Sequence, residues 1–243
     1  MSLRSRLSTM MFLEYAVWGA WTTVGAAYFQ SLGFSDTMIS WLFAALWLAC
    51  MVSPFIVGQI ADRYFPTQYF LAGAHLIGAV LLFLVGGERA FGAMLTWMVV
   101  YCLLYAPTLA LTNSICFYHL KNVNQEFGRI RVWGTIGWIV AGWILSGWRS
   151  AFDFQVLGDL FYVAACGSLL LGLLSFLLPH TPPREEARNP LAFLEAIRLL
   201  KDKNVAVFMA IAFVVTTELQ FYYFPHRSFF RSSEFRASSF RPS

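Results

Sequence analysis

The stretch that decides the fold is Arg129-Ile130-Arg131-Val132-Trp133-Gly134-Thr135-Ile136-Gly137-Trp138, which places two cations at the start of an apolar, glycine-rich segment. Continued as a helix, it puts Arg131, Thr135 and Trp138 at i, i+4 and i+7, on one face. An arginine that faces lipid costs roughly 2.5–3.5 kcal/mol on insertion scales, so in a membrane this face should point toward protein or water. The alternative is that Arg129 and Arg131 only anchor the helix end on the cytoplasmic side. Anchoring explains Arg129 well, and it explains Arg131 less well.

The composition is that of a membrane protein. Of the 243 residues, 58% are hydrophobic and only 12% are charged, whereas a soluble domain is nearer a quarter charged. The net charge of +4 does not indicate a nucleic-acid partner, because the basic residues lie in short loops rather than in one stripe. The four cysteines lie inside apolar runs without close pairing, which predicts neither disulfides nor a metal site. We find no nucleophile–base pair and no phosphate-binding loop, so we expect no enzyme, no metal and no cofactor.

Apolar runs predict six membrane-spanning helices and the start of a seventh. The expected ranges are 10–32, 38–60, 68–85, 93–118, 129–148, 158–178 and 205 onward. We therefore expect a six-helix transmembrane bundle over 1–178, a cytoplasmic linker with a surface helix over 179–203, an incomplete seventh transmembrane helix over 204–224, and an atypical disordered tail over 225–243. The tail is almost wholly Arg, Ser, Phe and Pro, which suggests a frameshift or truncation, or else a genuine disordered end.

The charges of the loops predict how the chain crosses the membrane. Most lysines and arginines lie in the N-terminus and in loops on one side, and only Arg89 and Arg149 lie on the other. By the positive-inside rule, the N-terminus and the linker are cytoplasmic. Six helices, a long link and the start of another set are the pattern of one half of a 6+6 transporter, whose substrate lies between the halves near the midplane. We expect an integral protein of the bacterial inner membrane.

Ionisable residues inside expected spanning helices are functional candidates by default. Glu14 in the first helix could take up a proton or bind a polar substrate, or it could snorkel or pair with a nearby arginine. Glu218 and Gln220 lie deep in the seventh apolar run. His75 in the third helix is either a hydrogen-bonded packing residue, which is the commoner role, or a proton relay.

A proline interrupts the fourth expected helix. Pro107 frees a backbone carbonyl, and nearby hydroxyl groups can satisfy such a carbonyl. The polar face of this helix carries Tyr101, Tyr105, Thr108 and Thr112. That face either lines a cavity or makes hydrogen bonds between helices.

Four motifs make the chain resemble the nucleoside:proton symporters of the major facilitator superfamily. They are FLEYAVWGAW at 12–21, YAPTLALTNS at 105–114, RIRVWGTIG at 129–137 and ELQ at 218–220. A run that carries Gly58, Asp62 and Arg63 resembles the helix 2–3 loop motif of the superfamily. The resemblance implies an all-α transmembrane fold, namely the N-terminal six-helix bundle of a major facilitator transporter plus a partial seventh helix, with Gly58, Asp62, Arg63 and Pro107 as structural motif residues.

The resemblance also implies proton-coupled nucleoside uptake by alternating access, with the proton gradient as energy source and no cofactor. It assigns nucleoside contacts to Arg131, Thr135, Trp138, Gln220 and Tyr223. Trp138 stands where a phenylalanine is expected, and Tyr223 where the family can carry an asparagine. Glu14 and Glu218 are the local candidates for proton coupling.

Other functions stay open at this point. A half-transporter remnant that moves nothing, or a membrane scaffold that pairs with another chain, would have the same helices. A facilitator for another polar solute, such as a sugar, would also suit arginine, threonine, glutamine and tryptophan side chains. The expected partners are a small-molecule nucleoside and the lipid bilayer. The sequence does not specify purine or pyrimidine preference, proton stoichiometry or oligomeric state.

Overall fold

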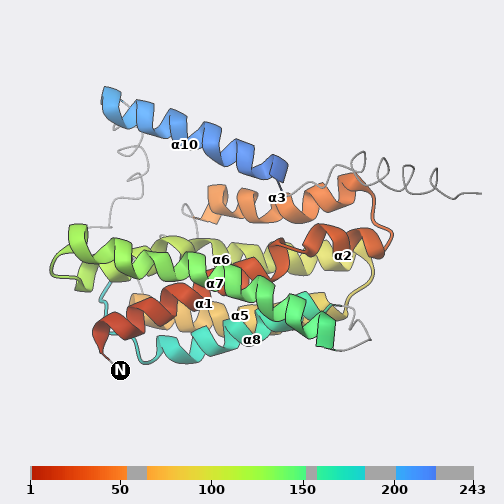
Figure 1. The fold of residues 1–243 in the computed structure, drawn as a ribbon, viewed down its shortest axis with the longest axis horizontal. Helices are drawn as coiled ribbons and strands as arrows, with labels where there is room; N and C mark the ends of the chain where they lie inside the picture. Colours follow the sequence, from red (N-terminus) through yellow and green to blue (C-terminus); the bar gives the residue numbers. More distant parts are fainter. Residues whose placement is uncertain (1, 54–64, 152–157, 184–200, 223–243) are drawn as a thin grey trace, which may run out of the picture. The chain divides into compact units, whose positions relative to one another are not determined.

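The computed structural model describes residues 2–53, 65–151, 158–183 and 201–222, without the side chains of 213 and 216–222. The regular elements in these residues are α-helices (Figure 1). They are α1 (Leu3–Thr22), α2 (Gly25–Ser31), α3 (Asp36–Ser53), α5 (Thr67–Gly87), α6 (Phe91–His119), α7 (Val123–Ala151), α8 (Asp159–Ser175) and α10 (Lys203–Tyr222). The chain forms two compact units, residues 1–194 and 195–243, so α1 to α8 belong to the first unit and α10 to the second.

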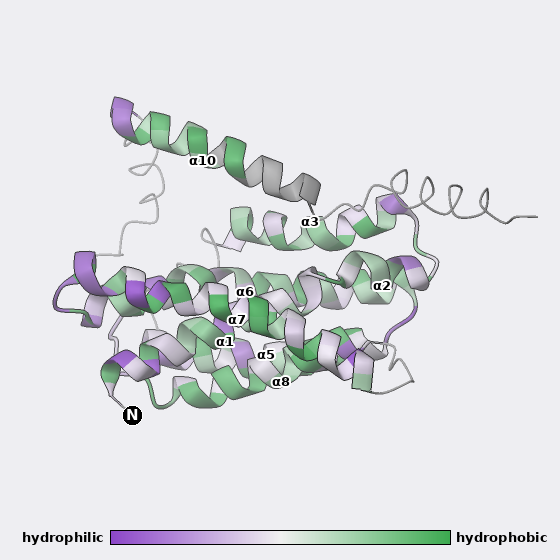
Figure 2. Cartoon of the chain, viewed as in Figure 1, coloured by the Kyte–Doolittle hydropathy of each residue, from purple (hydrophilic) through white to green (hydrophobic). Residues whose placement is uncertain are grey.

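The helices are built for a membrane. Among the described residues, α3, α5, α6 and α7 are each long and apolar enough to cross one. Hydrophobic residues dominate the helices (Figure 2), and many large ones are exposed, such as Val80 at 60%, Phe83 at 62% and Trp143 at 70%. Lipid is the environment in which such a surface is stable.

Several helix boundaries differ from those expected, and α1 already begins at Leu3 instead of residue 10. The first expected span is a pair of helices, because α1 ends at Thr22 and α2 begins at Gly25. The hydroxyls of Thr22 and Thr23 donate to the carbonyls four residues earlier, a contact that often bends helices. Helix α7 begins at Val123, about two turns before Arg129, so its arginines lie inside the helix rather than at its mouth. Glu126 in the first turn suits a helix N-terminus.

The first unit is organised around α1. Helix α1 packs along α7 and α8, α5 packs against α8 and α6, and α3 packs against α6. Figure 1 shows these helices running side by side. The largest buried side chains include Trp21 near the end of α1 and Phe29 of α2. The ring of Phe161 from α8 stacks on Trp21 and is tilted against Phe29. Gly158 has φ +93°, and a Cβ there would lie 2.1 Å from the Gly86 carbonyl oxygen, so glycine lets α8 start against the end of α5.

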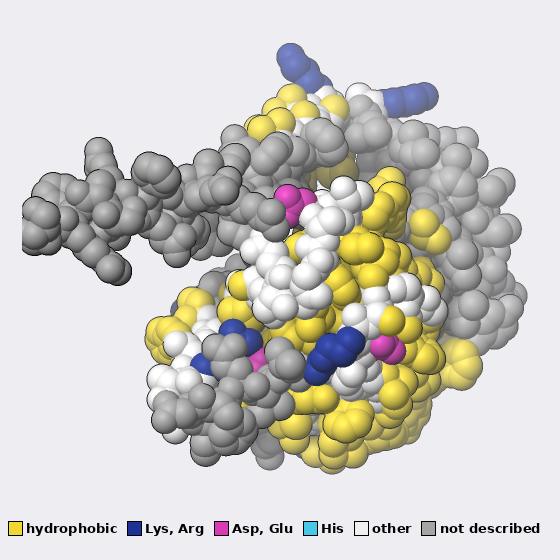
Figure 3. Space-filling model, turned by 90° about the vertical axis from the view of Figure 1, so that its right-hand side faces the viewer, with side chains coloured by type: hydrophobic (Ala, Val, Ile, Leu, Met, Phe, Trp, Pro, Cys, Tyr) yellow, Lys and Arg dark blue, Asp and Glu magenta, His cyan; other side chains and the backbone are white. Residues whose placement is uncertain are grey.

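Polar contacts join the helices at both ends of the unit. Near the start of α1, Arg4 pairs with Glu126, and Arg6 Nη1 donates to the Leu177 carbonyl at 2.8 Å. At the opposite end, Arg149 makes two 2.7 Å hydrogen bonds to the Asp159 carboxylate. Figure 3 views this opposite end, where charged side chains form small patches among hydrophobic ones.

Several sequence predictions lie outside the described residues. These are the structural motif residues Gly58, Asp62 and Arg63, the surface helix of the linker, and the tail over 225–243. They stay predictions.

Candidate functional site

Arg131 and Trp138, two of the predicted solute-binding residues of α7, contact α1. The guanidinium carbon of Arg131 lies 3.9 Å from the ring centroid of Tyr15. Two turns further along, the ring of Trp138 meets that of Trp18 edge-on, with centroids 4.9 Å apart. Cation–π and edge-to-face contacts of this kind are attractive. The arginine therefore points into a protein contact, as the first of the two sequence interpretations expects.

We call Tyr15, Trp18, Trp47, Arg131 and Trp138 the aromatic–arginine cluster. Trp47 of α3 joins it through an edge-on contact with Trp18 at 6.0 Å. Every member is half-buried, so part of each ring or guanidinium is accessible. The predicted contact residue Thr135 is exposed. Sequence reasoning missed Trp47, because nothing in its own apolar helix distinguishes it from a lipid-facing tryptophan.

A glycine makes the arginine's position possible. A Cβ at Gly134 would stand 2.7 Å from Nη1 of Arg131 and 2.7 Å from Cδ2 of Tyr15. Real Cβ atoms do not approach other atoms so closely, so only glycine at 134 lets Arg131 fold back over Tyr15. Gly134 of the RIRVWGTIG motif thus shapes the aromatic–arginine cluster.

A second feature lies in the core beside the cluster. Glu14 is fully buried, and its Oε2 lies 3.0 Å from Nε2 of His75. Its Oε1 accepts a 2.8 Å hydrogen bond from the Thr108 hydroxyl, and its backbone carbonyl accepts one of 2.8 Å from Tyr105. Glu14 therefore does not snorkel, and its partner is a histidine instead of an arginine. On the other side of the His75 ring, Nδ1 lies 3.1 Å from the hydroxyl oxygen of Ser168 in α8.

Two residues on the polar face of α6 make hydrogen bonds between helices. Tyr105 and Thr108 both reach residue 14 of α1. Thr112 donates to carbonyls of its own helix, at Thr108 and Leu109. Pro107 lies inside α6, one residue before the threonine that contacts Glu14.

The seventh expected helix is α10. Glu218 and Gln220 lie in its last turns, but their side chains are outside the described residues, as is Tyr223. Helix α10 belongs to the second unit, so what it adds to a site stays a prediction.

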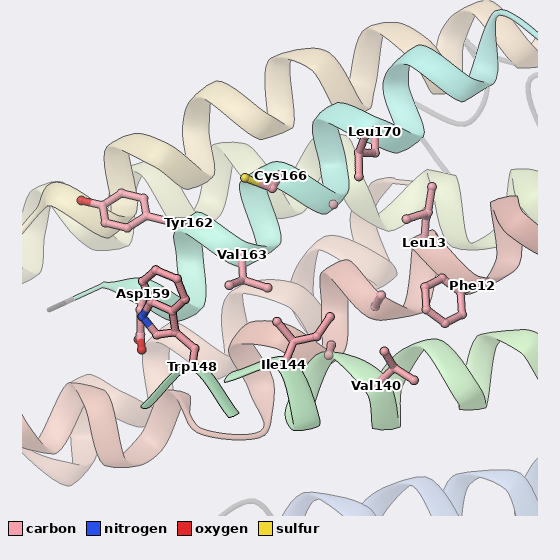
Figure 4. A pocket seen from close by; sticks show the side chains of 13 residues that line it. Phe12, Leu13, Val140, Ile144, Trp148, Asp159, Tyr162, Val163, Cys166 and Leu170 are labelled. Atoms are coloured by element: carbon pink, nitrogen blue, oxygen red, sulfur yellow. The ribbon is translucent and has the colours of Figure 1, made fainter. Parts of the chain in front are cut away.

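A cavity of about 460 Å³ lies elsewhere in the first unit, between α1, α7 and α8. Figure 4 shows side chains of these three helices turned toward it, and they are almost all apolar. The predicted residues Arg131, Thr135 and Trp138 are not in its lining. A polar solute needs a few convergent polar groups, which this lining does not supply, so the aromatic–arginine cluster is the better candidate. In the described part of the chain, no three metal-ligating side chains come together.

Comparison with known proteins agrees with this architecture. The family model described as Nucleoside H+ symporter matches residues 1–238. The putative nucleoside transporter YegT of Escherichia coli (strain K12) is 38% identical over 229 residues, which are 92% of this chain and 54% of that protein. The nucleoside permease NupG of the same strain is 32% identical and is covered to the same extent, with 90% of this chain aligned.

The crystal structure of the nucleoside transporter NupG superposes with a TM-score of 0.73 at 32% identity, over 90% of this chain and 56% of that one. The chain therefore spans about half the length of the relatives it matches. The predicted fold class, an all-α transmembrane bundle of six helices followed by a seventh, is confirmed by this match.

Proposed function

The chain belongs to the nucleoside H+ symporter family, and on that premise we propose that it serves proton-coupled uptake of nucleosides across the bacterial inner membrane. The family is one of transporters, not of enzymes. Alternating access in such folds moves two six-helix halves about a central substrate. We assign this chain to the N-terminal half, with its N-terminus in the cytoplasm, because most loop cations lie on that side.

The observation that carries the proposal is the aromatic–arginine cluster. A nucleoside has a planar base and a sugar with hydroxyl groups. The half-buried rings of Trp18 and Trp138 suit stacking on the base. Arg131 has five N–H donors in a rigid plane, so it can rest on Tyr15 and still offer donors to sugar hydroxyls or base carbonyls. The Thr135 hydroxyl, one turn along α7, can do the same at short range.

Gln220 and Tyr223 are the contacts that we assign to the seventh helix. In a two-half transporter the substrate contacts both halves. The seventh helix begins the second set, and the sequence resemblance is what supports Gln220 and Tyr223 as contacts from that set. Proton coupling is assigned to Glu14 and Glu218, and the proton gradient supplies the energy, so no cofactor is needed.

Binding of labelled uridine and adenosine to the whole 243-residue chain in lipid nanodiscs tests the site. We expect Arg131→Ala to weaken binding about ten- to a hundred-fold, because hydrogen bonds from a charged group contribute roughly 1.5–3 kcal/mol. Arg129→Ala is the matched control, since Arg129 is exposed on the same helix. Unchanged affinity in Arg131→Ala, with the protein folded, would overturn the assignment of the site.

Competition and uptake test the substrate and the coupling. Excess free ribose or glucose should not displace labelled uridine, because a sugar alone lacks the base. Displacement by sugars at equal concentration would make the protein a facilitator for sugars. Uptake by bacteria without their own nucleoside transporters should fall when a protonophore removes the gradient. Neither binding nor uptake of any nucleoside would favour a non-transporting remnant or a scaffold.

A further inference from the structure

We infer that Glu14 and His75 act as one proton-carrying pair, in which the imidazole shares the proton of the carboxyl group and Ser168 fixes the ring's tautomer. Its role in transport rests on the proposed function, which it deepens, but the pair itself can be examined without transport. His75 becomes a positioning and proton-sharing residue of the site rather than a packing residue alone.

The tautomer follows from the contacts of Ser168. Its Oγ lies 2.9 Å from the backbone carbonyl oxygen of His75 and 3.1 Å from Nδ1 of the same residue. A carbonyl oxygen only accepts, so the single hydroxyl hydrogen goes to it. The hydroxyl oxygen is then left to accept from Nδ1, which must carry a hydrogen.

A proton must then lie between His75 and Glu14. With its hydrogen on Nδ1, a neutral ring presents a lone pair at Nε2, 3.0 Å from Oε2 of Glu14. A bare carboxylate there would repel this lone pair and leave an uncompensated charge, and both side chains are at most 1% exposed. One proton on the line from Nε2 to Oε2 removes both problems. The pair is then either a carboxylic acid with a neutral imidazole or a carboxylate with an imidazolium, and its net charge is zero in both forms.

Thr108 suits both forms of the carboxyl group. Its Oγ1 lies 2.8 Å from Oε1 of Glu14 and is also within hydrogen-bond reach of the Tyr105 carbonyl. Oε1 keeps an acceptor lone pair whether the shared proton lies on Oε2 or on Nε2, so the Thr108 hydroxyl can donate to it in both forms. The proton can therefore move along the line from Nε2 to Oε2 without a change of rotamer at Thr108.

The surroundings leave the histidine as the basic partner. In the described part of the chain, Glu14 makes its one ion-pair contact with His75. The other titratable groups near the pair are tyrosines: Tyr15 next to it on α1, and Tyr101 and Tyr105 of α6, which stack on each other. The Tyr105 hydroxyl donates to the Glu14 carbonyl. The ring of His75 also meets the ring of Tyr105 edge-on.

The pair joins four helices and adjoins the candidate substrate site. Glu14 is on α1, His75 on α5, Thr108 on α6 and Ser168 on α8. The residue after Glu14 is Tyr15, which carries Arg131 on its ring. A change in the proton at Glu14 therefore alters hydrogen bonds one residue away from the aromatic–arginine cluster, which is a direct physical route between proton and solute.

Nitrogen-15 spectra of ring-labelled histidine in the whole chain, held in nanodiscs, test the pair. The chain has four histidines, and His75→Gln identifies the signals of His75 by their loss. We expect hydrogen on Nδ1 in the unmodified chain, and a large change in the Nε2 signal in Glu14→Gln. The control His119→Gln should leave the His75 signals unchanged, because His119 bonds Thr181 instead.

Infrared spectra supply a second readout that does not depend on one variant. Glu14 should give a carbonyl band if it carries the proton, or a carboxylate band if His75 carries it. This band should vanish in Glu14→Gln and should shift in His75→Gln. The pair is refuted by a His75 ring protonated only on Nε2 in the unmodified chain. It is also refuted if the His75 signals do not change in Glu14→Gln, or if the Glu14 band does not change in His75→Gln. If either variant fails to fold, two results still test the pair: the tautomer of His75 in the unmodified chain, and the change of that tautomer in Ser168→Ala.

Failure of the pair and failure of the proposed function are distinguishable. If the spectra show the shared proton but nucleosides neither bind nor enter, the proton-sharing pair is confirmed and the proposed function is refuted. If nucleosides accumulate against their own concentration gradient equally well in the unmodified chain and in His75→Gln, the proposed function is supported and the pair has no role in coupling. We expect His75→Gln to keep nucleoside exchange while its proton-driven accumulation falls toward simple equilibration.

Discussion

Gly137 of α7 packs directly on the backbone of Phe12 in α1. A Cβ at position 137 would lie 2.1 Å from the Phe12 carbonyl oxygen, so even alanine must push the two helices apart. We expect Gly137→Ala to destabilise the chain by about 1–3 kcal/mol, the usual range for overpacking. Gly142→Ala is the control on the same helix, since a Cβ there meets nothing within 4 Å. Thermal unfolding of both variants in one detergent measures the difference, and equal midpoints would show that α1 and α7 do not pack this closely.

Two tryptophans of α7, the half-buried Trp138 and the exposed Trp143, should behave differently toward solute. Trp138 contacts Trp18 in the aromatic–arginine cluster, whereas Trp143 is 70% exposed. Stacking on a base is worth about 1–3 kcal/mol, so Trp138→Ala should weaken nucleoside binding roughly five- to a hundred-fold. Trp143→Ala should leave affinity unchanged. Trp138→Phe should retain most of the binding, because a phenyl ring also stacks. A loss of binding in Trp143→Ala equal to that in Trp138→Ala would place the solute elsewhere.

The ion pairs at the two ends of the unit should differ in strength. Asp159 is 5% exposed and accepts two hydrogen bonds from Arg149 and one from the Leu160 N–H, so we expect Asp159→Asn to destabilise by about 1–3 kcal/mol. Glu126→Gln removes the pair with Arg4, whose side chain is 69% exposed, and should change stability by less than about 1 kcal/mol.

The effect of salt on stability should also distinguish the two ion pairs. Added salt screens exposed charges far more than buried ones. The effect of Glu126→Gln should therefore vanish at high ionic strength, while that of Asp159→Asn persists. Chemical unfolding at low and high salt measures both, and an Asp159→Asn effect that disappears with salt would contradict the buried geometry.

The turn between α5 and α6 should contribute an acid-sensitive element of stability. The N–H groups of Ala90 and Arg89 donate to the Glu88 carboxylate at 2.9 and 2.8 Å and lower the pKa of that carboxyl group. Because the pKa is lower in the folded chain than in the unfolded one, this contribution is fully present above the unfolded pKa. It is lost as the pH falls through the folded pKa. Glu88→Gln should remove this part of the acid dependence of the unfolding midpoint, and an unchanged pH profile would argue against these two hydrogen bonds.

The sequence determined the helices and the class of protein. Long apolar runs with few charges can satisfy their backbone in lipid only as helices, so six spans and the start of a seventh could be predicted from hydropathy alone. The spacing of Arg131 and Trp138 also fixed their common face, since 3.6 residues per turn is a local property. The break after Thr22 and the start of α7 at Val123 were not predicted, because helix ends depend on hydroxyl and carboxylate contacts that hydropathy does not register.

Only the tertiary structure decided which partners these side chains meet. Glu14 and His75 are 61 residues apart, and periodicity gives each of them a face but not the neighbour of that face. The packing of α1, α5, α6 and α8 brings the carboxylate to a histidine instead of an arginine. The position of α3 in the same unit brings Trp47 to Trp18. Local sequence fixes directions along one helix, whereas a shared proton or a stacked ring needs atoms from several helices within hydrogen-bond or van der Waals distance, which packing alone provides.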